Sequence, residues 1–114
     1  ALPIYEMLRA VRLVVDTGLH SGTMNREEAI KYFLSNISYD EAAATAEIER
    51  YMAMPGQALS YKIGALKIRE LRDQYQQEFG SKFSLAKFHD EVLNQGCLPL
   101  DVLDRKMELW AKKQ

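Results

Sequence analysis

The segment between residues 3 and 20 restricts the possible folds most, because it is apolar on nearly every side of a helix except one. At about 100° per residue, one row of titratable side chains falls within roughly 80°: Tyr5, Arg9, Arg12, Asp16 and His20. Leu, Val, Ala, Gly and Met fill most of the other sides. Such a helix belongs in a protein interior, where charges are costly unless they are paired or face a wet cavity. The row is therefore either an internal seam of ion pairs or the wall of a site.

Two features of this row bear on the choice between seam and site. Asp16 follows Arg12 by four residues, which is the spacing of an intrahelical salt bridge and favours the seam. His20 titrates near neutral pH and can donate or accept a hydrogen bond, which favours the site. The residues by themselves leave both interpretations open.

Helical periodicity continues through the rest of the chain. Asn25 with Glu28, and Ser38 with Glu41, have the spacing of a capping box at the start of a helix. No run alternates with period two, so we expect no sheet. The pattern predicts an all-α fold, an irregular bundle of about six helices: residues 3–20, 26–36, a third that is capped at Ser38 and ends at residue 53, 56–79, 85–95 and 99–112. The short connection between the second and third predicts an antiparallel hairpin over the first.

The helix predicted at residues 56–79 has two glycines with different expected roles. Gly80 follows it and is expected to be its left-handed cap. Gly64 lies within it, on one face with Gln57 and Tyr61. Because glycine in mid-helix costs about 1 kcal/mol relative to alanine, we expect another segment to approach the backbone closely at Gly64.

The size and composition of the chain exclude several classes of protein. At 114 residues it suits a single domain with one core. A net charge of -1 disfavours non-specific binding of nucleic acid. Cys97 is the only cysteine, so an intrachain disulfide and a thiolate zinc cluster are excluded. With no signal peptide and no run of eighteen apolar residues, we expect a soluble chain that does not enter a membrane.

The common catalytic motifs are also missing. The only histidines are His20 and His89, so the two histidines at helical spacing that an H-E-x-x-H zinc site needs do not occur. There is no G-x-S-x-G elbow, P-loop or G-x-G-x-x-G. The sequence starts at Ala1 without an initiator methionine and leads directly into a helix expected to be buried. We therefore expect a fragment of a larger protein.

Three blocks of sequence carry a resemblance to a known family. They are Arg-Ala-Val-Arg-Leu-Val-Val-Asp-Thr-Gly-Leu-His at residues 9–20, Pro-Gly-Gln-Ala-Leu-Ser-Tyr-Lys-Ile-Gly at residues 55–64, and Leu-Pro-Leu-Asp-Val-Leu at residues 98–103. Together they look like the carboxy-terminal part of the bacterial domain of unknown function 885 (DUF885) family, whose members resemble zincin-like zinc metallopeptidases. Their order and spacing cover essentially the whole chain.

This resemblance implies which parts of a site the chain holds and which it lacks. In the family, the zinc-binding helix and a downstream Glu ligand precede the Arg-Ala-Val-Arg block, so we expect no metal ligand in this chain and zinc only in a full-length parent. The implied partners are the missing amino-terminal part of the same polypeptide and, in the parent, a peptide substrate. Residues 1–114 would then be a single helical carboxy-terminal region.

The resemblance also implies roles for five residues. Tyr61 and His20 would be catalytic, stabilising the oxyanion that forms when a peptide bond is attacked. Arg12 would bind a substrate carboxylate, with Asp16 orienting it, and Gln57 would be a weaker substrate-binding residue. For Tyr61 the alternative is a core tyrosine whose hydroxyl finds a backbone partner.

Two functions follow from these observations. The first is the helical half-cleft of a zinc-dependent peptidase, inactive as the isolated fragment and open to self-association through its uncovered surface. The second is an all-helical interaction or ligand-binding module without catalysis, acting through a groove between the first and fourth helices. The sequence leaves the compartment open among cytoplasmic, periplasmic and secreted.

Overall fold

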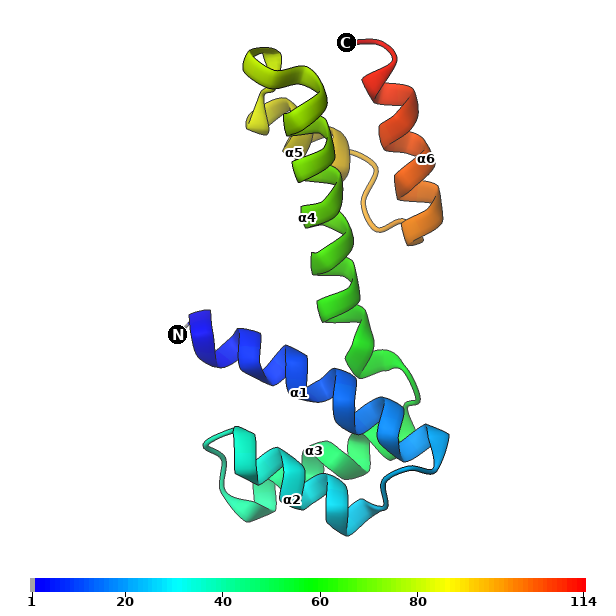
Figure 1. Cartoon of the computed structure of the whole chain (residues 1–114). Coiled ribbons are helices and arrows are strands. Elements are labelled where there is room, and N and C mark those ends of the chain that lie inside the picture. Colours follow the sequence, from blue (N-terminus) through cyan, green and yellow to red (C-terminus); the bar gives the residue numbers. More distant parts are fainter. Residues whose placement is uncertain (1) are drawn as a thin grey trace. The chain divides into compact units, whose positions relative to one another are not determined.

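The computed structural model describes residues 2–114, with the backbone alone for Leu2, and every regular element in it is helical (Figure 1). Ala1, where the sequence suggested an internal start, lies outside the described residues. No strand occurs in the described part, so the all-α prediction is confirmed. The elements are six α-helices and two short 3-10 helices: α1 Leu2–Ser21, α2 Arg26–Asn36, α3 Glu41–Ala53, η1 Gln57–Leu59, α4 Ser60–Phe79, η2 Gly80–Lys82, α5 Leu85–Leu93 and α6 Leu100–Ala111.

The chain divides into two compact units, unit 1 (Ala1–Ile63) and unit 2 (Gly64–Gln114). Each unit has its own cluster of buried apolar side chains. The expectation of one core is therefore wrong. That residues 1–114 form a single region of a longer protein stays a prediction.

Unit 1 is built around α1. Helices α2 and α3 pack against each other and both contact α1, as the short connection between them predicted (Figure 1). The 3-10 helix η1 also contacts α1. The apolar cluster between these elements includes Val11, Val15, Phe33, Ile48, Tyr51 and Ala58, and Asp16 is buried beside it. These contacts place one face of α1 against the segment that leads into α4.

Local rules explain most of the helix ends. The capping box of Asn25 and Glu28 is present, and Gly80 after α4 has a φ of 53°, as predicted. The predicted cap at Ser38 is wrong, because Asp40 directly precedes α3 and its side chain accepts a hydrogen bond from the Ala43 amide at 2.8 Å. Residues 57–59 form η1 instead of the first turn of α4, since Gly56 turns the chain with a φ of 80°.

The close approach expected at Gly64 is not present. A Cβ atom added there would meet no atom of the described residues within 4 Å, whereas one added at Gly18 would lie 2.9 Å from Cβ of Met24. The turn after α1 folds back on Gly18, since the amides of Thr23 and Met24 both donate to its carbonyl. The packing glycine of this chain is therefore Gly18.

Unit 2 has a core of aromatic and aliphatic side chains contributed by the later part of α4 and by α5 and α6. The rings of Tyr75, Phe79 and Trp110 lie with each pair of centroids 5.8 Å apart, and Phe88 packs edge-on to Trp110 at 6.4 Å. Leu71, Val92, Leu103 and Met107 complete the buried cluster. Aromatic pairs at these distances contribute about 0.5–1.5 kcal/mol each beyond the apolar area they bury.

Candidate functional site

Arg12 projects from α1 onto α3 and the start of α4, where it contacts three side chains of unit 1. Its Nε donates a hydrogen bond to the Tyr51 hydroxyl at 3.0 Å, and Nη2 donates to Oε2 of Glu47 at 3.3 Å. The guanidinium also lies over the ring of Tyr61, 5.2 Å from its centroid. Only 15% of the Arg12 side chain is exposed. The cation is therefore fixed in place and largely removed from water.

Glu47 is the carboxylate that balances this charge. It accepts hydrogen bonds from the Tyr51 hydroxyl at 2.7 Å and from Arg50 at 2.9 and 3.2 Å. The hydrogen bond from Arg50, followed by those from Tyr51 and the charges of Arg50 and Arg12, lowers the pKa of Glu47 to about 2 despite its partial burial. Burial, and then the bond to Glu47, raises the pKa of Tyr51 to about 12. At neutral pH the group thus contains an ionised carboxylate and a neutral phenol.

The predicted salt bridge between Arg12 and Asp16 is not formed. Arg12 pairs instead with Glu47, which offers both a negative charge and a hydrogen-bonded tyrosine from the helix opposite. Asp16 contacts His20 and the Gly56 amide instead, so it makes no direct bond to Arg12 among the described residues, and its role in orienting Arg12 toward a substrate stays a prediction. The row of titratable side chains on α1 therefore makes its pairs across elements as well as within the helix.

Asp16 is the most deeply buried charged residue of this row, with 2% of its side chain exposed. Its Oδ1 lies 2.9 Å from Nδ1 of His20 and 3.2 Å from the backbone nitrogen of Gly56, which donates to it. Nδ1 of His20 is also 2.9 Å from the carbonyl oxygen of Asp16. This carbonyl, and after it the Asp16 carboxylate, raises the pKa of His20 above its usual range, with partial burial opposing them.

Tyr61 and Gln57 lie on the segment opposite α1. Tyr61 is 49% exposed, and its hydroxyl has no hydrogen-bond partner among residues 2–114. Oε1 of Gln57 accepts from Nη1 of Arg50 at 3.0 Å. The ammonium of Lys62 reaches Glu6 on α1 at 2.8 Å and so ties the first turn of α4 to α1. These contacts hold the segment from Gln57 to Lys62 against α1 within unit 1.

The predicted site residues therefore fall into two groups. Arg12 and Asp16 are buried and paired, as a seam of charges requires. His20, with 31% of its side chain exposed, and Tyr61 remain accessible. Tyr5 at the amino-terminal end of the row is 58% exposed and joins neither group.

Comparisons with known proteins show which family this chain resembles and which solved structure is similar to it. The sequence profile of the family described as "Bacterial protein of unknown function (DUF885)" matches residues 4–107. The chain belongs to this family. A crystal structure described as that of "the putative lipoprotein from Colwellia psychrerythraea" is 52% identical to it, with a TM-score of 0.93. The match covers 96% of this chain but 19% of that one, so the chain spans about a fifth of this relative. No curated protein matches.

The DUF885 chain contains three site residues that were not predicted: Glu47, Arg50 and Tyr51. Glu47 precedes Arg50 by three residues and Tyr51 by four, so that all three share one face of α3. That spacing was visible in the sequence. Nothing local indicated, however, that the Tyr51 hydroxyl would meet Arg12, 39 residues earlier.

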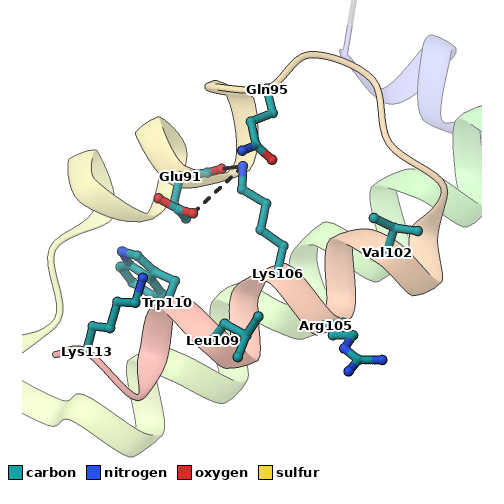
Figure 2. Close-up of a pocket in the computed structure, with 8 residues that line it drawn as sticks. All are labelled: Glu91, Gln95, Val102, Arg105, Lys106, Leu109, Trp110 and Lys113. Carbon is teal, nitrogen blue, oxygen red and sulfur yellow. Dashed lines mark hydrogen bonds and ion pairs between the residues drawn. The ribbon is translucent and has the colours of Figure 1, made fainter.

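A separate hollow in this DUF885 chain lies between α5 and α6 in unit 2 (Figure 2). Its volume is about 430 Å³, and its lining includes Trp110, Val102 and Arg105. Lys106 reaches across it to the end of α5, where it donates to the carbonyl of Glu91 (Figure 2). It also donates to Oδ1 of Asn94. Lys106 therefore caps α5, and none of the predicted site residues lines this hollow.

The residues of this DUF885 member do not fit a zinc site. Within residues 2–114, no group of three or more His, Cys, Asp or Glu side chains is arranged to hold a metal ion. The Asp16 and His20 pair provides two such groups, but a zinc site takes at least three protein ligands. Over the same residues, no helix is both long and apolar enough to cross a membrane.

Proposed function

We propose that this chain forms one wall of the substrate site in a larger peptide hydrolase of the DUF885 family. The proposal is supported by the resemblance of the family to zincin-like peptidases and by the accessibility of both Tyr61 and His20. The rest of the enzyme would be supplied by a longer polypeptide, and the Colwellia relative is such a longer chain, since the match covers 19% of it. The isolated chain is expected to be inactive.

The observation that carries this proposal is the way Tyr61 is held. Its ring lies against a cation that is itself fixed by Glu47 and Tyr51, yet the residue is 49% exposed. A core tyrosine would be buried with its hydroxyl bonded to a backbone group. A fixed ring with a free hydroxyl is what a preorganised hydrogen-bond donor needs.

The chemistry available to this wall is stabilisation of negative charge. When water adds to the carbonyl carbon of a peptide bond, the carbonyl oxygen becomes an oxyanion, and a donor placed near it lowers the barrier. The Tyr61 hydroxyl can donate one hydrogen bond to that oxygen. His20 can donate a second from its outer ring nitrogen, because its raised pKa keeps more of the imidazole protonated. The nucleophile and its activation would come from the rest of the polypeptide.

Arg12 and Gln57 have supporting roles in this proposal. Arg12 is engaged by Glu47 and Tyr51, so it positions Tyr61 and does not bind a substrate carboxylate on its own. Gln57 uses its oxygen for Arg50, which leaves its amide NH₂ to donate to a substrate carbonyl. Since the described residues do not fit zinc, its ligands in the longer polypeptide would be other residues, and no step above depends on the metal.

The partner of this wall is proposed to be the remainder of the same polypeptide. Large apolar residues of α1 are exposed: Ile4, Tyr5, Met7 and Val14. Exposed apolar side chains on one helix suit an interaction with another segment, and in the isolated chain they favour self-association. This observation also favours the second candidate, a helical interaction module without catalysis. Because the Colwellia relative is described as a lipoprotein, we propose a periplasmic or secreted location.

The experiment that tests the proposal replaces Tyr61 by Phe in a longer polypeptide that contains this chain. Loss of one oxyanion donor is expected to lower the turnover of a peptide substrate by more than about tenfold with little change in KM. Tyr39→Phe is the matched control, because Tyr39 lies between α2 and α3 and packs on Phe33 away from the site. Turnover that is unchanged in Tyr61→Phe would remove Tyr61 from the mechanism and favour the interaction module.

A further inference from the structure

The geometry points to Asp16 as a positioning residue that fixes His20 and the turn before Tyr61 through one carboxylate oxygen. This inference rests on the proposed function, since it assigns a role relative to the same two side chains. The sequence resemblance implied a substrate-binding role for Asp16. Its side chain is 2% exposed, however, and cannot reach a ligand. The contacts of Asp16 indicate what it does instead.

Oδ1 of Asp16 joins two separate segments of unit 1. Nδ1 of His20, one turn later on α1, lies 2.9 Å from this oxygen. The backbone N–H of Gly56, 40 residues later in the chain, donates to the same oxygen at 3.2 Å. Both candidate catalytic groups are therefore held relative to one atom. A displacement of that atom would move His20 and the turn at Gly56 together.

The contact with His20 determines which ring nitrogen carries the proton. Nδ1 has two oxygen atoms at 2.9 Å, the carboxylate and the backbone carbonyl of Asp16, and both can only accept. Nδ1 must therefore carry a hydrogen, and the neutral ring has its lone pair on Nε2. The other group that faces the imidazole is the Met52 carbonyl at the end of α3, which also raises its pKa. Nε2 is thus the nitrogen that gains and loses the proton.

The contact with Gly56 fixes the path of the chain toward Tyr61. Gly56 has a φ of 80°, a conformation that other residues rarely adopt, and its amide bonds to Asp16 just before η1 begins. Ala58, in η1, is fully buried against the core of unit 1. Tyr61 follows in the first turn of α4. Asp16 therefore anchors the start of the segment that presents the Tyr61 ring to Arg12.

The remaining oxygen of Asp16 explains why a carboxylate suits this position. Oδ2 is buried and has no hydrogen-bond partner among the described residues. A buried negative charge that is only partly satisfied favours a positive charge beside it, and the imidazole of His20 is the adjacent group that can supply one. An amide at this position would keep the acceptor oxygen but lose that charge.

The test uses the 114-residue chain labelled with ¹⁵N and follows the ring nitrogens of His20 by NMR as the pH is varied. The chain has two histidines, and His89→Gln identifies their signals. The wild type is expected to show the Nδ1–H form of the neutral ring. In Asp16→Asn the tautomer is kept, because the amide oxygen still accepts, and the pKa of His20 falls by about one pH unit. In Asp16→Ala the backbone carbonyl of residue 16 still accepts from Nδ1, so this tautomer is also kept, and the pKa of His20 falls at least as far as in Asp16→Asn.

Asp40→Asn and Asp40→Ala are the matched controls. Asp40 caps α3 through one hydrogen bond from the Ala43 amide. Its replacement therefore also removes a carboxylate and lowers stability, but it does not change the contacts of His20. Far-UV circular dichroism checks that each variant is folded. If Asp16→Ala does not fold, Asp16→Asn still decides the question. A His20 pKa in Asp16→Asn equal to that of Asp40→Asn would overturn the inference.

Activity separates this inference from the proposed function. In the longer polypeptide, Asp16→Asn is expected to shift the pH dependence of turnover in the same direction as the pKa of His20, with KM nearly unchanged. If the NMR result is as expected but Tyr61→Phe has full turnover, the proposed function fails while the positioning by Asp16 stands. If Tyr61→Phe loses turnover but Asp16→Asn changes neither the ring signals nor the pH profile, the positioning role fails alone.

Discussion

Unit 1 buries Asp16 and most of Arg12 inside an otherwise apolar core, whereas unit 2 fills its core with aromatic and aliphatic side chains. Burying charges costs several kcal/mol per ion, and their attraction only partly offsets that cost. Well-packed apolar residues would serve stability at least as well, as unit 2 illustrates. The comparison therefore separates a unit that contains buried charges from a unit whose core depends on apolar packing alone.

Unit 2 also contains ion pairs, but they lie outside its apolar cluster. Lys67 pairs with Asp104 at 3.1 Å, and such partly exposed pairs contribute about 0–1 kcal/mol. Lys106 is more buried and pairs with Glu91 at 3.8 Å. The Tyr75 hydroxyl is buried with no partner among the described residues, and burial raises the pKa of this phenol. No hydrogen-bonded network like that of Arg12, Glu47 and Tyr51 is present in the core of unit 2.

The largest predicted effect is the loss of stability when a side chain of the unit 2 core is truncated and leaves a cavity. Phe88 is fully buried, so Phe88→Ala should lower the free energy of unfolding by about 3–5 kcal/mol through lost apolar burial and the cavity left behind. Urea unfolding followed by far-UV circular dichroism measures this. Leu93→Ala on the same helix is the control, because Leu93 is 71% exposed and should cost less than about 0.5 kcal/mol. Equal losses in the two variants would show that unit 2 does not depend on its core.

The features of the fold and of the site that could be predicted from the sequence are those whose residues lie close together along the chain. The helices, the cap at Asn25 and the left-handed Gly80 follow from residues a few positions apart, and the structure has them. The row on α1 was also visible, because it needs only helical periodicity. Its partners were not, since Arg12 meets Glu47 and Tyr51 across 35 and 39 residues. An intrahelical Asp16 was the nearest candidate by spacing, and tertiary contacts overrode it.

A smaller effect on stability, one that depends on pH, is expected for Glu47 in unit 1. The pKa of Glu47 is lowered to about 2, below its value of about 4.5 in the unfolded chain. Its stabilisation is therefore complete above about pH 4.5 and is lost as the pH falls toward 2. Glu47→Gln should be less stable than the wild type by about 2 kcal/mol at pH 7, after allowance for solvent screening, and equally stable near pH 2.

Asp104→Asn in unit 2 is the matched control for this titration. Asp104 makes a surface pair with Lys67, so its replacement should cost at most about 1 kcal/mol. Urea unfolding at a series of pH values from 2 to 7 measures both variants. A pH-independent difference between Glu47→Gln and the wild type would mean that the charge of Glu47 does not contribute to unit 1.

The smallest effect is expected where the chain passes from unit 1 to unit 2. Gly64, the first residue of unit 2, lies within α4 with no neighbour that a Cβ would meet, so Gly64→Ala should raise the free energy of unfolding by about 0.5–1 kcal/mol. Gly56→Ala should lower it, because the φ of 80° is unfavourable for alanine. Thermal unfolding compares the two. Destabilisation by Gly64→Ala would contradict the open surroundings of this residue.

The position of Trp110 makes the two units separately observable. It is the only tryptophan of the chain, and it is surrounded by Tyr75, Phe79 and Phe88 in the core of unit 2. Its emission spectrum and quenching by acrylamide therefore report on unit 2 alone, with no engineered fluorophore. Any ligand, denaturant or covalent label that acts only on unit 1 should leave that emission unaltered, and the chain thus carries an intrinsic optical probe for one half of itself.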